Sequence, residues 1–210
     1  LIIIIISLLI FLSKWSLFIF DKDIIFKFIF DYDGDGRYWI PYIKFISQLN
    51  LNNSFDAEIN NLNILPVPIG SLFIYSFFFK LFNIHGLIYI EFFIILIFLI
   101  IFFKLFLLVT DEFKSLLFSL ILLSIPSIIF LLDVNYFNLL SLSENFFSFR
   151  PHRPIFSNIF FYFYIYILFK IYQSQEIRNN DLYIFSFLME LTFSSFYYFF
   201  LILAVAFFVL

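Results

Sequence analysis

The stretch LIYIEFFIILIFLIIFFKLFLLV, which runs from Leu87 to Val109, decides the fold of this chain. Only Glu91 and Lys104 carry a charge within it. An α-helix rises about 1.5 Å per residue, so about 20 mainly apolar residues cross the hydrocarbon layer of a bilayer, which is about 30 Å thick. The stretch is therefore long and apolar enough to cross a membrane as a helix.

The rest of the chain shares this apolar character. Hydrophobic residues make up 64% of the sequence and charged residues 13%, and the mean hydropathy is +1.06. Soluble domains are nearer half apolar and a quarter charged. A water-soluble fold of 210 residues would leave too much apolar surface facing solvent. The composition therefore predicts an integral-membrane protein.

Other segments meet the same criterion of length and polarity. We predict further membrane-spanning helices at Leu1–Phe20, Ser115–Leu132, Ile155–Tyr172 and Leu182–Leu210. The segment Val67–Phe82 is shorter and contains a lysine, which favours a helix that lies in the membrane interface. The expected fold class is all-α: a polytopic membrane helical bundle of about five transmembrane helices and a short interfacial helix.

This arrangement predicts which loops share a side of the membrane. The long loop 21–86, with juxtamembrane helices such as Ser16–Phe30, and the loop 133–153 are expected on the extracytoplasmic side. The short linkers 110–114 and 173–181 are expected on the cytoplasmic side, because basic residues concentrate there. The basic residues flanking these linkers are Lys104, Lys114, Lys170 and Arg178.

Composition also excludes several functional classes. The net charge of −3 and the lack of a basic polar surface exclude nucleic-acid binding. With no cysteine there is no disulfide, thiolate metal site or cysteine nucleophile. The G-x-S-x-G, P-loop and H-E-x-x-H motifs of soluble enzymes are absent. Because the sequence begins at Leu1 and stops inside an apolar run, we expect 1–210 to be a single membrane domain from a longer chain.

The strongest chemical signal is an acidic run in the long loop. Asp31, Asp33 and Asp35 alternate with other residues, and the intervening glycines allow a tight turn. Such carboxylates can converge on a divalent cation, Mg²⁺, Mn²⁺ or Ca²⁺, or on a sugar phosphate. The run begins like an EF-hand loop, but Tyr42 replaces the bidentate glutamate, and Pro41 is expected to break the exiting helix. A solvated acidic turn is the alternative.

A second cluster precedes the predicted helix at 155. Arg150, His152 and Arg153 could clamp a phosphate, because a guanidinium binds phosphate bidentately. Asp133 and Glu144 lie in the same loop and could add acidic groups to this substrate-binding site. The alternative is that the arginines anchor a helix end at lipid headgroups.

A polar stripe interrupts the last apolar segment. Ser186, Glu190 and Ser194 recur at helical spacing, which predicts a polar stripe facing the bundle interior. The glutamate could line a pathway, or it could simply be protonated and hydrogen-bonded between helices. Glu91 is close enough to its helix start to reach the interface.

Taken together, these motifs resemble the N-terminal half of membrane glycosyltransferases of the C superfamily, over roughly residues 1–160. The resemblance rests on a first span, an acidic loop, a proline-rich helix start at Pro66-Val67-Pro68-Ile69 and an exit at Lys80-Leu81-Phe82 followed by Gly86. A later apolar segment ends near Pro126 and leads into a polar loop, as in that family.

This resemblance implies a multi-pass protein of the bacterial inner membrane that transfers a sugar from a polyprenyl-phosphate donor at the cell envelope. It implies a catalytic aspartate in the first extracytoplasmic loop, for which Asp31, Asp33 and Asp35 are the candidates. The expected partners are the lipid bilayer and the lipid-linked sugar, and not nucleic acid. The alternatives are a transporter, with Glu91 and Glu190 as coupling acids, and a membrane assembly subunit without catalytic activity.

Overall fold

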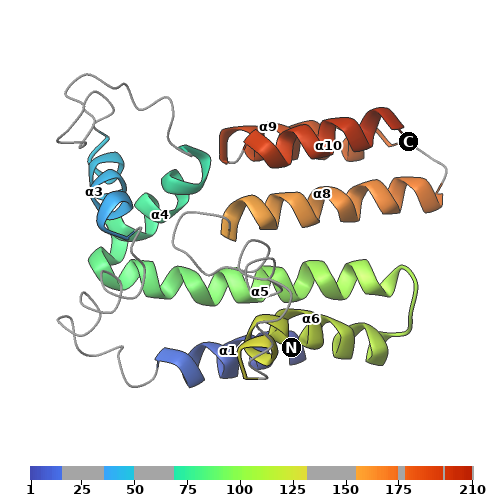
Figure 1. The fold of residues 1–210 in the computed structure, drawn as a ribbon, viewed down its shortest axis with the longest axis horizontal. Helices are drawn as coiled ribbons and strands as arrows, with labels where there is room; N and C mark the ends of the chain where they lie inside the picture. The colour runs from blue at the N-terminus through green and yellow to red at the C-terminus, as the bar shows by residue number, and fades with distance from the viewer. Residues whose placement is uncertain (16–35, 50–68, 132–154, 175–177, 196, 210) are drawn as a thin grey trace. The chain divides into compact units, whose positions relative to one another are not determined.

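The computed structural model describes residues 1–15, 36–49, 69–131, 155–174, 178–195 and 197–209, and every regular element in these residues is helical (Figure 1). They form two compact units, and the boundary between the units falls inside one helix, between Ile95 and Leu96. The all-α class predicted from the sequence is confirmed for these residues.

In the first unit, a short amphipathic helix packs against a second helix. Helix α3, Gly36–Ser47, buries Ile40, Ile43 and Ile46, which recur every three residues along one face. It contacts α4, Ile69–Phe82, whose buried face includes Leu72 and Tyr75. The apolar face of α3 is therefore buried within the first unit.

Helix α3 also corrects one expectation. It begins at Gly36 and continues past Pro41, so this proline does not break the helix as the sequence predicted. An EF-hand loop starting at Asp31 would need non-helical ligand positions through its second half. Residues 36–42, which would supply them, are helical instead, which agrees with the sequence evidence against an EF-hand. The juxtamembrane helix predicted at 16–30 lies outside the described residues.

A sharp turn separates α4 from the long apolar helix α5, Gly86–Leu107. Helix α4 ends at Phe82, a single turn of 3-10 helix, η1, covers Asn83–His85, and Asn83 adopts a left-handed conformation with φ of 53°. The chain folds back there, because the rings of Phe78 and Phe93 lie 5.4 Å apart. The prediction of a short helix ending at Phe82 is confirmed, and its interfacial location is untested.

Helix α5 matches the stretch from which the fold was predicted. Its 22 residues rise about 33 Å, enough to cross a hydrocarbon layer. Within the described residues, the stretch Gly70–Leu107, which includes the turn at η1, is the one that is long and apolar enough by length and composition to cross a membrane. Helix α1, Ile2–Trp15, is a shorter apolar helix packed through Phe11 on Phe92 of α5. These features support membrane association.

In the second unit, the helices predicted at 115–132 and 155–172 are present. They are α6, Glu112–Leu131, and α8, Ile155–Ser174. Helix α8 contacts the C-terminal half of α5, where the ring centroid of Tyr162 lies 4.9 Å from that of Phe102. Helix α6 follows α5 after a short linker, and Phe118 of α6 lies 5.6 Å from Phe106. Whether α6 and α8 cross a membrane is untested.

The last apolar segment is not one helix, contrary to the prediction for 182–210. It forms α9, Asn179–Ser195, and α10, Tyr197–Val209, which fold back on each other beside α8 (Figure 1). The rings of Phe185 and Phe207 lie 5.1 Å apart, whereas a straight helix would separate these positions by about 33 Å. The reversal follows Ser194 and Ser195 directly, but the segment contains no glycine or proline, the residues that mark a turn most strongly in a sequence.

Side chains near the middle of α8 hold this hairpin. The ring of Tyr164 lies 4.1 Å from that of Phe185 in α9, and its hydroxyl donates a hydrogen bond of 3.2 Å to the carbonyl of Leu203 in α10. Tyr164 is completely buried. One residue therefore contacts both arms of the hairpin, and α8, α9 and α10 form a three-helix cluster.

Candidate functional site

A carboxylate is buried inside the first unit. Glu91, in the second turn of α5, is 8% exposed, and its Oε2 accepts a hydrogen bond of 2.6 Å from Nε1 of Trp15. Trp15 is the last residue of α1 and is 4% exposed. A buried ionisable group is costly without partners, so it is a candidate for a functional role. The indole N–H supplies one such partner across 76 positions of sequence.

This contact corrects one expectation from the sequence. Glu91 does not reach outward to an interface, because it is buried against Trp15. Nearby, His85 and Tyr89 stack with ring centroids 6.3 Å apart at the start of α5. The sequence signal for Glu91 was its position inside an apolar run, but nothing in the sequence connected it with Trp15.

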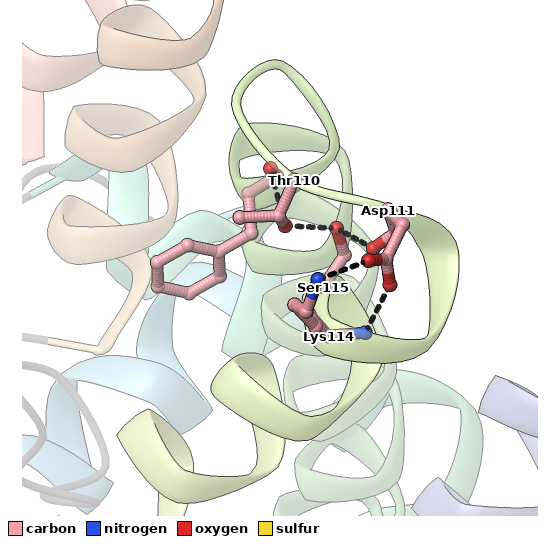
Figure 2. A network of polar contacts seen from close by, with 5 residues as sticks. Thr110, Asp111, Lys114 and Ser115 are labelled. Atoms are coloured by element: carbon pink, nitrogen blue, oxygen red, sulfur yellow. Dashed lines mark hydrogen bonds and ion pairs between the residues drawn. The ribbon is translucent and has the colours of Figure 1, made fainter.

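A polar network caps the N-terminus of α6 (Figure 2). Asp111 accepts hydrogen bonds from the backbone N–H of Lys114 at 2.9 Å and from its Nζ at 2.6 Å. The hydroxyl of Ser115 donates to the carbonyl of Asp111 and lies 2.8 Å from the hydroxyl of Thr110. Asp111 therefore acts as the N-cap residue, satisfying a helix donor that has no partner within the helix.

This cap predicts an acid sensitivity of the start of α6. The hydrogen bonds from Lys114 hold the pKa of Asp111 below its ordinary value of 3.8. The stabilisation is therefore complete above pH 3.8 and is lost as the pH falls through the lowered pKa. We expect Asp111→Ala to lower the protection of the Lys114 amide, meaning how much more slowly it exchanges than in an unstructured peptide at the same pH, and acid to lower this protection in the native protein. Asp111→Asn, which can still cap, should show little acid dependence.

The α5–α6 linker and the α8–α9 connection lie at the same end of the second unit. Nε2 of Gln173 donates a hydrogen bond of 3.1 Å to the carbonyl of Leu108, and Nζ of Lys170 lies 3.1 Å from a carboxylate oxygen of Asp181. The α5–α6 linker and the C-terminal end of α8 therefore lie together, and a cytoplasmic location for them stays a prediction. Charged side chains collect at this end of the unit, which suits an aqueous or headgroup environment.

The polar stripe of α9 faces outward, not into the bundle. Ser186 and Glu190 are exposed, whereas Leu188 and Thr192 are buried. The buried face of α9 is thus turned away from the glutamate that the sequence interpretation placed inside. The prediction failed because the polar residues of α9 do not share one face: Thr192 and Ser195 are buried, so the spacing of Ser186 and Glu190 does not mark the buried side.

The other predicted site residues lie outside the described residues. They are Asp31, Asp33, Asp35, Asp133, Glu144, Arg150, His152 and Arg153. Their proposed convergence on a phosphate or a divalent cation stays a prediction. Among the residues that are described, no three histidine, aspartate or glutamate side chains gather where they could hold a metal ion.

Comparison with known proteins identifies no relative: no family model, no curated protein and no solved structure matches this chain.

Proposed function

We propose that this chain is a polytopic protein of the bacterial plasma membrane that transfers a sugar from a polyprenyl-phosphate donor at the extracytoplasmic face. The observation that carries the proposal is the order of elements around the acidic run. Asp35 is bonded to Gly36, the first residue of amphipathic α3, and α3 packs on α4, which leads into membrane-length α5. Such an order suits an acidic site at a membrane surface.

The chemistry needs a carboxylate that stays ionised close to lipid headgroups. A carboxylate next to a helix N-terminus is stabilised in its charged form, and Asp35 holds that sequence position. It, or Asp33, would take the proton from an acceptor hydroxyl as the oxygen attacks the anomeric carbon. Negative charge develops on the leaving lipid phosphate, and Arg150 or Arg153 would stabilise it.

The acidic run is tested by substitution. We expect Asp33→Asn or Asp35→Asn to lower sugar transfer from radiolabelled polyprenyl-phosphate hexoses and pentoses by at least about a hundredfold, the usual contribution of a general base. Asp56→Asn, in the same long loop but outside the run, is the matched control and should keep full activity. Undiminished transfer by both variants of the run would remove these aspartates from the mechanism.

Compartment labelling tests whether the acidic run and the arginines share a membrane face. The chain has no cysteine, so single cysteines can be introduced without further changes. We expect Gly34→Cys and Ser148→Cys to react with a membrane-impermeant maleimide from outside intact cells. Reaction from opposite compartments would rule out a common active site.

The buried Glu91 favours a second candidate function, a transporter in which this acid couples substrate movement to a cation or proton. Intramembrane carboxylates that face the protein interior often have this role. Uptake that is lost in Glu91→Gln but retained in Asp33→Asn would support transport. The reverse pattern in a transfer assay would support the glycosyltransferase.

A further inference from the structure

A single carboxylate interrupts an exposed apolar surface on α9. This surface, the Glu190 face, consists of the exposed Tyr183, Ser186, Phe187, Glu190 and Phe193. Tyr183 is 73% exposed, Phe187 59% and Phe193 53%. Glu190 has no hydrogen bond or ion pair with any residue in the part of the chain that the structure describes.

The depth of Glu190 follows from the geometry of the hairpin. Asp181 pairs with Lys170 at the polar end of the unit, where the α5–α6 linker lies beside the C-terminal end of α8. Glu190 lies nine positions further along α9, which is about 14 Å from Asp181. The hydrocarbon layer is about 30 Å thick, so the carboxylate would lie near its midplane if the unit inserts from this end.

A carboxylate at that depth cannot face lipid alone. Charged groups near the centre of a bilayer cost several kcal/mol and pair with other groups. A second copy of this chain would place two acidic groups on a symmetric interface and would supply no cation from this face to neutralise either of them. A lysine or arginine on another helix would neutralise the charge, while Phe187 and Phe193 pack against the apolar remainder of that helix.

We propose that the Glu190 face binds a transmembrane helix that carries a lysine or arginine near its midpoint. The inference rests on the membrane location in the proposed function, but not on sugar transfer. The sequence interpretation treated Glu190 as an interior acid, whereas its outward direction makes it a recognition group for a partner helix. The flanking aromatic side chains provide the apolar contact area, and the carboxylate selects the partner by charge.

The test uses the whole chain reconstituted in phosphatidylcholine vesicles with fluorescent model helices. One helix is leucine-rich with a central lysine, and its companions have leucine or glutamate at that position. We expect energy transfer to show about tenfold tighter association of the lysine helix than of the leucine helix, a difference of about 1.4 kcal/mol. Glu190→Gln should remove the preference, and Glu190→Asp should retain part of it.

Glu112→Gln, which changes the exposed carboxylate at the first residue of α6, is the matched control and should leave the preference unchanged. Equal binding of the lysine and leucine helices would overturn the proposal. So would self-association of the chain that depends on Glu190, or rapid reaction of Glu190→Cys with a water-soluble thiol reagent, which would indicate an aqueous cavity. Release of the chain from membranes by alkaline carbonate would show that it is not embedded in the bilayer and would overturn this proposal. Loss of sugar-transfer activity alone would contradict the proposed function but not helix binding by the Glu190 face.

Discussion

Replacing Gly86 by alanine is expected to be among the most destabilising single changes in the described part of the chain. Gly86 begins α5 directly after the turn, and an added Cβ would overlap the backbone carbonyl of Phe78 and lie 3.0 Å from the backbone nitrogen of Phe79. Backbone atoms cannot move aside by changing rotamer, so α4 and α5 would have to separate. We expect a loss of about 3 kcal/mol in the free energy of unfolding.

The measurement is unfolding of the purified chain in mild detergent. Gly70→Ala, the same change inside α4, is the control, and we expect it to be neutral or slightly stabilising because alanine is the better helix former. Unfolding of Gly86→Ala at the same denaturant concentration as the native chain would show that α4 and α5 do not approach this closely.

The contact between Trp15 and Glu91 carries the second large prediction. Trp15→Ala removes a large buried side chain and is expected to cost about 3–5 kcal/mol. Trp15→Phe retains most of the ring but removes the N–H that donates to Glu91, which should cost about 1–3 kcal/mol. The difference between these two variants separates packing from hydrogen bonding.

A double-mutant cycle tests the contact directly. Glu91→Leu and Trp15→Phe are each measured alone and together by unfolding in detergent. Because the two side chains are hydrogen-bonded, the double variant should be destabilised by less than the sum of the single variants. Simple additivity would mean that the pair does not interact. Ser13→Ala, an exposed change on α1, controls for effects on the helix itself.

Much of the fold could be predicted from runs of apolar residues and from the proline, glycine and polar residues at which these runs begin or end. The helix predicted at 87–109 is found at Gly86–Leu107, and that predicted at 155–172 is found at Ile155–Ser174. In each case proline, glycine or a polar stretch marks the helix start or end. Local signals of this kind are encoded within a few residues, so they can be read from the chain alone.

The candidate site was harder to predict, because its contacts join distant residues. The sequence drew attention to the acidic run and the arginines by their chemistry, and these lie outside the described residues. The sequence did not show that Glu91 is buried against another side chain, because its partner Trp15 is 76 positions away. It also assigned Glu190 to the interior, where the structure has Leu188 and Thr192 instead.

The sequence by itself determined that this chain is helical and strongly apolar, because helix length and hydropathy depend on neighbouring residues. Only the tertiary structure decided the reversal between α9 and α10, the outward direction of Glu190 and the burial of Glu91 against Trp15. The physical reason is that apolar residues surround α5 and α10 on nearly every side, while polar residues occur on both the buried and the exposed sides of α9. Without a polar face to mark the solvent, packing between helices alone selects which side is buried.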